Sequence, residues 1–309
     1  MITIVGSGRV GATTAFALLL HEVDTQITLI DVIKGLPQGE AVDLNHAAAI
    51  LGLGTRVKGS NDYADMQGSD IVIVTAGLAR KPGMTREQLA AQNAKIVADV
   101  AEQIKKYAPD SIVIITTNPL DAMVTVLYKK LKFPRNRVIG FSGILDSSRL
   151  AYYSSLLVNI SPTSIVPVVL GQHGENMYPV PELSYVYGKP LTEFLTKEQY
   201  EQVVKQTIGA GAEIINLRGF SSNWGPAAGL LKMVEAIKRD RKEVIEASVY
   251  LDGEYGVKDV FVEVPVVLGK NGVEKVIELN LNPTQKELFM KSVEAVKNNL
   301  KQVPPEFLQ

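Results

Sequence analysis

Five short, almost continuously apolar runs in the first half of the chain constrain its fold most strongly. Buried strands of a parallel sheet have this composition because helices cover both of their faces. Helical stretches separate the runs, and strand–helix–strand repeats with short connections form right-handed crossovers. These repeats predict an α/β fold with a doubly wound parallel sheet. The predicted strands are Ile2–Val5, Ile27–Ile30, Ile71–Thr75, Ile112–Thr117 and Val138–Phe141, and the predicted helices are Val10–His21, Glu40–Leu51, Arg86–Tyr107 and Leu120–Leu131.

The second half of the chain has a different rhythm, in which β-rich runs and hairpin signals alternate with helices. Residues 269–272, which include two glycines, lie between two β-rich runs as a hairpin turn does. This pattern predicts an α+β domain, and a boundary at residue 142 divides the chain into residues 1–142 and 143–309. The predicted strands are Ile165–Leu170, Phe261–Leu268 and Val273–Leu279, and the predicted helices are Leu145–Val158, Lys197–Leu217, Ala227–Arg239 and Thr284–Leu300.

A G-x-G-x-x-G motif follows the first predicted strand and opens the first predicted helix. Its first glycine permits a tight turn, its second lets a pyrophosphate approach the backbone, and its third allows the helix to pack closely on the strand. The free N–H groups at the start of such a helix bind phosphates. The motif predicts a Rossmann dinucleotide-binding domain, with cofactor contacts from Gly6, Ser7, Gly8, Arg9, Val10 and Gly11.

Asp31 ends the second predicted strand, where an acidic residue of this fold accepts hydrogen bonds from the adenosine ribose. A 2′-phosphate bound there would lie close to the carboxylate and be repelled by on the order of a few kcal/mol. Asp31 therefore favours NAD over NADP. The alternative interpretation is a tight structural turn followed by a solvated aspartate.

Composition excludes several other classes of protein. The 32 Lys+Arg and 33 Asp+Glu residues give no basic excess of the kind that nucleic-acid or anionic-membrane binders show. The lack of cysteine excludes disulfides and thiolate sites, and with three histidines no metal site is predicted. Met1 leads directly into an apolar run without a signal peptide, and no run reaches the roughly 20 apolar residues of a membrane helix. We therefore expect a cytoplasmic protein.

Three groups of polar residues are candidates for chemistry. Arg80 and Arg86 lie in a Gly- and Pro-containing loop, which suits a lid that carries charge to an anionic substrate, although a solvated surface loop has the same composition. Asp146 and Arg149 share one helix face, as members of a surface ion pair also do. His173 has glycines on both near sides, and its titration range suits proton exchange; a structural histidine is the alternative.

Taken in order, eight segments of the chain resemble the lactate/malate dehydrogenase family. The resemblance covers nearly the whole chain, and agreement at eight ordered segments is far more specific than any single motif. It implies an NAD-dependent oxidoreductase in which a substrate-binding catalytic domain follows the Rossmann domain. The segments are GSGRVGA, Asp31, DVIKGLPQGEAVDL, TAGLARKPGMTR, TTNPLD, GILDSSR, GQHGENM and NWGPAAG.

The resemblance also implies roles for individual residues. His173 resembles the acid/base that takes the substrate hydroxyl proton, and Asp146 resembles the carboxylate that orients this histidine. Arg149 resembles the residue that binds the C1 carboxylate through a bidentate fork, and Arg86 resembles the loop arginine that polarises the reacting carbonyl. The predicted substrate contacts also include Asn118 and Ser222, and further cofactor contacts are predicted at Thr75, Ala76, Gly77, Asn93, Thr117 and Asn118.

Arg80 distinguishes between substrates within this family, because the malate enzymes carry Arg at this position and the lactate enzymes usually carry Gln. Oxaloacetate has a second carboxylate that an arginine can neutralise, whereas pyruvate would leave a buried arginine unpaired. We therefore expect reversible hydride transfer between (S)-malate or oxaloacetate and NAD(H). The alternatives are a lactate or other 2-hydroxy-acid dehydrogenase, and a catalytically silent NAD-binding protein that keeps the fold.

The family resemblance also bears on assembly, which composition does not reveal. It implies a homo-oligomer, either a homotetramer or a homodimer. The helical stretches Glu40–Leu51 and Ala151–Val158 are candidate contact faces, although either could equally belong to the core.

Overall fold

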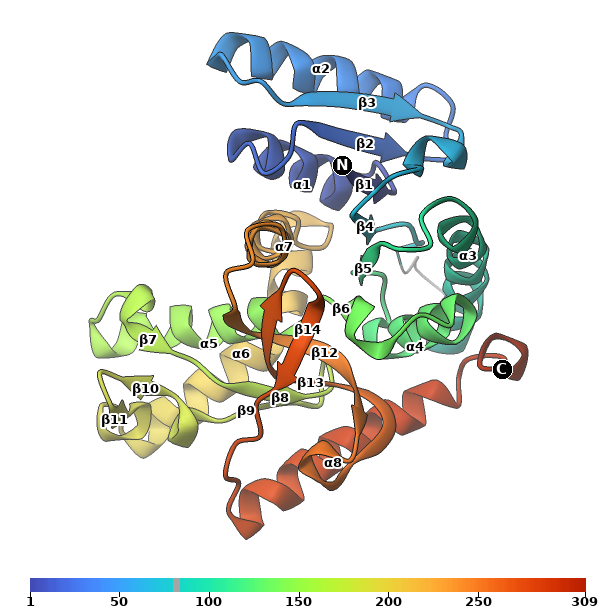
Figure 1. Cartoon of the computed structure of the whole chain (residues 1–309). Coiled ribbons are helices and arrows are strands. Elements are labelled where there is room, and N and C mark those ends of the chain that lie inside the picture. The colour runs from blue at the N-terminus through green and yellow to red at the C-terminus, as the bar shows by residue number, and fades with distance from the viewer. Residues whose placement is uncertain (80–83) are drawn as a thin grey trace.

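The first half of the chain alternates strands with helices, as predicted, in a computed structural model that describes residues 1–79 and 84–309. The elements are β1 (Ile2–Val5), α1 (Arg9–Leu20), β2 (Gln26–Ile30), α2 (Leu36–Leu51), β3 (Arg56–Ser60), β4 (Ile71–Val74), α3 (Arg86–Tyr107), β5 (Ile112–Ile115), α4 (Leu120–Leu131) and β6 (Val138–Gly140). The strands pair in parallel in the order β3-β2-β1-β4-β5-β6. This order confirms the predicted doubly wound Rossmann sheet (Figure 1).

The second half of the chain mixes short strands, two long strands and helices. Its elements are α5 (Gly143–Val158), β7 (Ile165–Val166), β8 (Val169–Gly171), β9 (Met177–Pro179), β10 (Tyr185–Val186), β11 (Lys189–Pro190), α6 (Lys197–Arg218), α7 (Trp224–Lys238), β12 (Glu243–Asp252), β13 (Lys258–Gly269), β14 (Gly272–Val276) and α8 (Pro283–Leu300). The predicted turn at residues 269–272 joins β13 to β14, which pair as an antiparallel hairpin. The second half therefore has the predicted α+β character.

The sheet is continuous between the two halves of the chain. Strand β12 pairs with β6 through Ser248 and Gly140, and the order then continues β12-β13-β8-β9 with antiparallel pairing. In Figure 1 the parallel part lies above this antiparallel extension, with α3 and α4 on one side and α7 on the other. The division into residues 1–142 and 143–309 stays a prediction, and this sheet crosses it.

Helices cover both faces of the parallel sheet, which explains why its strands are so apolar. Ile2 and Ile4 of β1 pack into a core with residues of α1, α2 and α7. Val5 of the same strand packs on the opposite face, with residues of α3 and α4. The chain beyond α8 returns to that second core through Val303, so the C-terminal end lies beside α4 (Figure 1).

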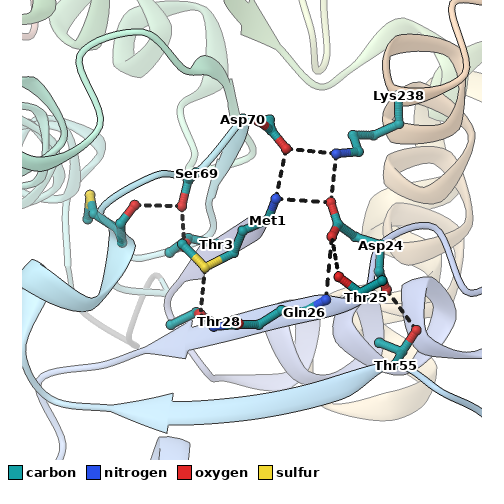
Figure 2. A network of polar contacts seen from close by, with 11 residues as sticks. Met1, Thr3, Asp24, Thr25, Gln26, Thr28, Thr55, Ser69, Asp70 and Lys238 are labelled. Carbon is teal, nitrogen blue, oxygen red and sulfur yellow. Dashed lines mark hydrogen bonds and ion pairs between the residues drawn. The ribbon is translucent and has the colours of Figure 1, made fainter.

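A charged network also joins the two halves (Figure 2). The Lys238 ammonium at the end of α7 lies 2.7 Å from an oxygen of Asp24 and 2.7 Å from an oxygen of Asp70, both in the first half. The Met1 ammonium contacts the same two carboxylates, at 3.1 and 2.7 Å. Burial alone would raise the pKa of Asp24, but Lys238 and the terminal ammonium outweigh it and lower that pKa.

Differences from the predicted elements have local causes. Strand β3 lies outside the predicted strands because only Val57 and Ser60 of its residues are buried, so it has no continuous apolar run. The prediction of one strand over Ile165–Leu170 is wrong, because Pro167 cannot donate a backbone hydrogen bond and separates β7 from β8. These two strands pair with different partners, β10 and β13. Among the residues described, no helix is both long and apolar enough to cross a bilayer.

Candidate active site

The glycine-rich turn between β1 and α1 needs two of its glycines for steric reasons. Gly6 has φ +105°, and a Cβ on it would lie 2.7 Å from the Thr75 hydroxyl oxygen. That hydroxyl donates a 2.9 Å hydrogen bond to the Gly6 carbonyl. A Cβ on Gly11 would lie 1.9 Å from the same carbonyl oxygen, so α1 packs this closely on the turn only through glycine. A Cβ on Gly8 would meet nothing within 4 Å, which leaves its backbone open to a ligand.

The start of α1 offers unused polar groups beside Asp31. The Ser7 N–H donates a 2.7 Å hydrogen bond to the Asp31 carboxylate, which fixes the acid beside the turn. The buried Ser7 hydroxyl has no hydrogen-bond partner among the residues described. Gly8 occupies the N-cap and supplies no capping side chain, so the first N–H groups of α1 are available. These features fit the pyrophosphate and ribose of a dinucleotide.

Side-chain hydrogen bonds connect the ends of β4 and β5 at the same edge of the sheet. The Asn93 side chain accepts from the Leu78 N–H at 2.8 Å and donates to the Asn118 carbonyl at 2.7 Å. The Thr117 hydroxyl donates to the Ala76 carbonyl at 2.7 Å. The backbone near the predicted cofactor site is therefore held by its own side chains. The predicted cofactor contacts that share this edge are Thr75, Ala76, Gly77, Asn93, Thr117 and Asn118.

The loop before α7 rests on the first two turns of α1. Asn223 donates a 3.0 Å hydrogen bond to the Thr13 hydroxyl, and the Arg9 guanidinium carbon lies 3.5 Å from the centroid of the Phe220 ring. Arg9 therefore faces this loop from the glycine-rich turn. Ser222 lies in the loop and is partly exposed, and its predicted contact with substrate stays a prediction.

Asp146 is the centre of a three-residue cluster that joins α5 to the chain after β8. One carboxylate oxygen lies 2.6 Å from Nδ1 of His173, and the other accepts a 2.7 Å hydrogen bond from Arg149. Asp146 is fully buried, while His173 and Arg149 keep 16% and 13% of their side chains exposed. The alternative of a surface ion pair is therefore wrong. The exposed fractions leave the imidazole and the guanidinium within reach of a ligand.

A second buried carboxylate, Asp121 of α4, supports His173 through the backbone. It accepts a 2.9 Å hydrogen bond from the His173 N–H and a 2.7 Å hydrogen bond from the Ser248 hydroxyl. Burial raises the pKa of Asp121 to about 6, against the effects of Ser248 and His173. Burial by itself lowers the pKa of His173, but the Asp146 and Asp121 carboxylates more than compensate, and the pKa is raised.

Of the two arginines in the predicted lid, Arg80 and Arg86, the structure describes only Arg86. Arg86 is the first residue of α3, which begins with a capping box formed by Thr85 and Gln88. Its guanidinium lies 2.6 Å from a Glu175 oxygen, in an ion pair whose two side chains are mostly exposed. Arg86 thus reaches the loop that carries His173 but is paired there with an acid. Arg80 lies outside the described residues, and its predicted role stays a prediction.

Two buried acids near the histidine were not among the predicted site residues. Asp121 stands in a helical turn whose neighbours are all buried, and Glu263 stands in the apolar stretch of β13. A single acid within a fully buried stretch is itself a signal, because burying a carboxyl group is costly unless it has partners. The site assembled by the fold thus contains more carboxyl groups than the motifs indicate.

Comparisons with known proteins agree with this geometry. Residues 1–140 match the model of the lactate/malate dehydrogenase NAD binding domain, and residues 144–306 match that of the lactate/malate dehydrogenase alpha/beta C-terminal domain. The malate dehydrogenases of Caldivirga maquilingensis and Pyrobaculum aerophilum are 76% and 61% identical over 309 residues, which is 100% of each chain. The structure of the malate dehydrogenase from Aeropyrum pernix matches with a TM-score of 0.97 at 56% identity, covering 100% of both chains. This chain therefore belongs to the lactate/malate dehydrogenase family.

Proposed function

We propose that this protein is an NAD-dependent malate dehydrogenase that catalyses reversible hydride transfer between (S)-malate or oxaloacetate and NAD(H). The observation that carries the proposal is the buried Asp146 carboxylate, which holds both His173 and Arg149. This cluster lies in a chain whose first 140 residues match the NAD-binding domain of the family. The curated relatives described above are named malate dehydrogenases, which supports malate as the substrate.

His173 is the acid and base of the proposed reaction. Asp146 accepts the Nδ1 proton of the imidazole, so Nε2 is the nitrogen that takes the substrate hydroxyl proton in oxidation and returns it in reduction. The raised pKa of His173 favours the imidazolium that this transfer forms. A bound nicotinamide would supply the hydride chemistry, by exchanging a hydride with the carbon that carries the substrate hydroxyl.

The two arginines of the described region have separate proposed tasks. Arg149 already gives one N–H to Asp146 and presents its remaining N–H groups to the C1 carboxylate of the substrate. Arg86 must exchange Glu175 for the substrate before it can polarise the reacting carbonyl. Because both members of that ion pair are largely exposed, the exchange costs little. We assign further substrate contacts to Asn118 and Ser222.

Arg80 carries the proposed choice of substrate. The residue type offers a guanidinium for the second carboxylate of oxaloacetate, for which pyruvate has no counterpart.

The proposal also includes a cytoplasmic location and assembly into a homotetramer or homodimer. Exposed apolar side chains on the predicted contact helices support assembly, among them Ile50 of α2 and Leu156 of α5, which are 84% and 62% exposed.

Steady-state kinetics test the proposal. The absorbance of NADH or NADPH is followed with oxaloacetate and, separately, with pyruvate. We expect kcat/KM to be highest for oxaloacetate with NADH, and Arg80→Gln to lower it sharply while raising the relative use of pyruvate. No oxidation of NADH with either keto acid would favour the catalytically silent alternative, and unchanged specificity constants in Arg80→Gln would refute the role of Arg80.

A further inference from the structure

Glu263 is a buried acid behind the catalytic pair that has no role in the proposed reaction. It lies in the middle of β13, where it is paired with Ser248 of β12 on one side and with Gly171 of β8 on the other. Its exposed fraction is 0%. Because His173 follows two residues after Gly171, strand pairing alone brings this acid to the inner side of the histidine.

The carboxyl group of Glu263 is close to the pair but is not hydrogen-bonded to it. Carboxyl oxygens of Glu263 and Asp146 and a ring nitrogen of His173 all lie within 4.8 Å of one another. Neither oxygen of Glu263 has a partner within hydrogen-bond distance among the described residues, and the nearby Ser142 hydroxyl is itself without one. A buried polar group that lacks partners lowers stability, so an acid kept in this position needs an explanation.

The charges around Glu263 determine its protonation state. Asp121 from α4, Asp146 from α5 and Glu246 from β12 are the acids that act on it. On the positive side, the His173 ring lies within 4.8 Å of it, and Arg149 binds the neighbouring Asp146 carboxylate. Burial raises the pKa of Glu263 well above its ordinary value, and the three acids raise it further, while the Ser142 hydroxyl acts weakly in the opposite direction. Both effects favour the uncharged form of Glu263.

We propose that Glu263 is a positioning residue: a neutral carboxylic acid that forms a polar wall behind the Asp146–His173 pair and keeps Asp146 as the single carboxylate that the imidazole contacts. An ionised Glu263 would compete with Asp146 for the imidazolium, and an apolar side chain would remove the polar atoms next to Asp146. A neutral acid avoids both effects. The kinetic part of this inference rests on the proposed dehydrogenase function, whereas the charge state of Glu263 does not.

Two substitutions and a control separate the possibilities. Glu263→Gln keeps the shape and polarity of a neutral acid, and Glu263→Met keeps the length but removes the polarity. Glu294→Gln makes the same chemical change at an exposed position of α8. All three proteins are compared with the wild type as full-length chains.

The pH dependence of unfolding tests the charge state without requiring activity. A carboxyl group whose pKa is raised in the folded state stabilises the fold fully below its unfolded pKa, and this contribution is lost as pH rises toward the folded pKa. Above pH 5 the wild type should therefore lose stability relative to Glu263→Gln, by up to about tenfold in the folding equilibrium per pH unit. A difference that does not change between pH 5 and 8 would overturn the neutral state of Glu263.

The pH profile of kcat/KM for oxaloacetate reduction tests positioning. We expect Glu263→Gln to keep the midpoint pH of the wild type to within about 0.3 units, since it changes no charge. Glu263→Met should lower kcat about tenfold and move the midpoint to lower pH, because a drier surrounding disfavours the imidazolium. If Glu263→Met had the kcat and the midpoint pH of the wild type, Glu263 would only fill space and the positioning role would be overturned. A change of a full pH unit in the midpoint of Glu263→Gln would overturn it as well. Inactivity of the wild type toward oxaloacetate would refute the proposed function, and the unfolding data would still decide the charge state.

Discussion

Asp146→Asn is the substitution that most directly tests how the site works. The asparagine side chain has the same shape, but its amide carries no charge and can present an N–H to Nδ1 of His173. Asp146 is fully buried and lies 2.6 Å from that nitrogen. The substitution therefore removes the negative charge that favours the imidazolium, and it leaves the tautomer of His173 undefined.

The magnitude follows from the geometry. The two charges are spread over a carboxylate and a ring, so their centres are about 4 Å apart, and with an effective dielectric constant of about 20 their attraction is about 4 kcal/mol. That energy corresponds to a fall of about 3 units in the pKa of His173. The Asp121 carboxylate also favours the imidazolium and remains, so the observed fall should be somewhat smaller.

The assay is the pH profile of kcat/KM in both directions. In the proposed reaction, reduction of oxaloacetate needs protonated His173. We therefore expect its rate to fall as pH rises through the pKa of this residue, which Asp146 and Asp121 hold above the ordinary value against the effect of burial. In Asp146→Asn this falling limb should move down by about 2 to 3 pH units, which lowers reduction by about 100- to 1000-fold at a pH above the wild-type limb and by less at lower pH. Malate oxidation needs neutral His173 and should lose rate mainly through the wrong tautomer.

Asp110→Asn, at an exposed position, serves as the control for this substitution. Binding of NADH to Asp146→Asn shows whether the fold is intact. A falling limb at the wild-type pH, together with kcat/KM within threefold of the wild type, would refute the electrostatic role that we give to Asp146.

Two further predictions concern the cofactor and the contact between the halves. Asp31→Ser should lower the preference for NADH over NADPH by about tenfold or more, because a carboxylate that Ser7 fixes beside the turn no longer repels a 2′-phosphate; an unchanged ratio of the two kcat/KM values would show that Asp31 does not discriminate. Lys238→Met should lower the free energy of unfolding by about 1 kcal/mol at pH 7, since it removes the ammonium that contacts Asp24 and Asp70. Because these contacts lower the pKa of Asp24, the difference in stability between Lys238→Met and the wild type should shrink as pH falls below about 4. If the two proteins unfolded at the same temperature at pH 7, the network would not contribute to stability.

Sequence patterns predicted those elements that are buried on both faces. The predicted helix Leu120–Leu131 and the predicted strand Ile2–Val5 have the bounds that the structure shows. Strand β12 lies outside the predictions because charged residues at positions 243 and 246 interrupt its apolar pattern. Glu246 is half-buried there, and its surroundings raise the pKa of its carboxyl group to about 7, mainly through loss of solvation. A tertiary environment of this kind overrides local propensity.

Asp146, Arg149 and His173 lie together in the structure, as the resemblance implies. Spacing along the chain predicts only the contact between the first two of these residues, because the third comes from a distant segment. Asp146 and Arg149 are close because of helix geometry, and His173 joins them through strand pairing. Asp121 contacts His173 through a backbone N–H, a contact for which no side-chain pattern exists. The sequence motifs identify the side chains of the predicted site. The packing of β12 and β13 determines which further acids surround those side chains.

Two glycines permit β12 to contact the end of β6 and the start of α5, and this packing depends on both contacts. A Cβ on Gly140 would lie 2.8 Å from the Cβ of Ser248, and a Cβ on Gly143 would lie 2.3 Å from the Cβ of Glu246. Only glycine allows backbones to approach so closely. Gly143 is also the first residue of α5, so the close approach fixes where that helix begins and hence where Asp146 lies, one turn later. The position of the Asp146 carboxylate is therefore set by a contact between the two halves of the chain, and hydrophobic periodicity carries no signal for it.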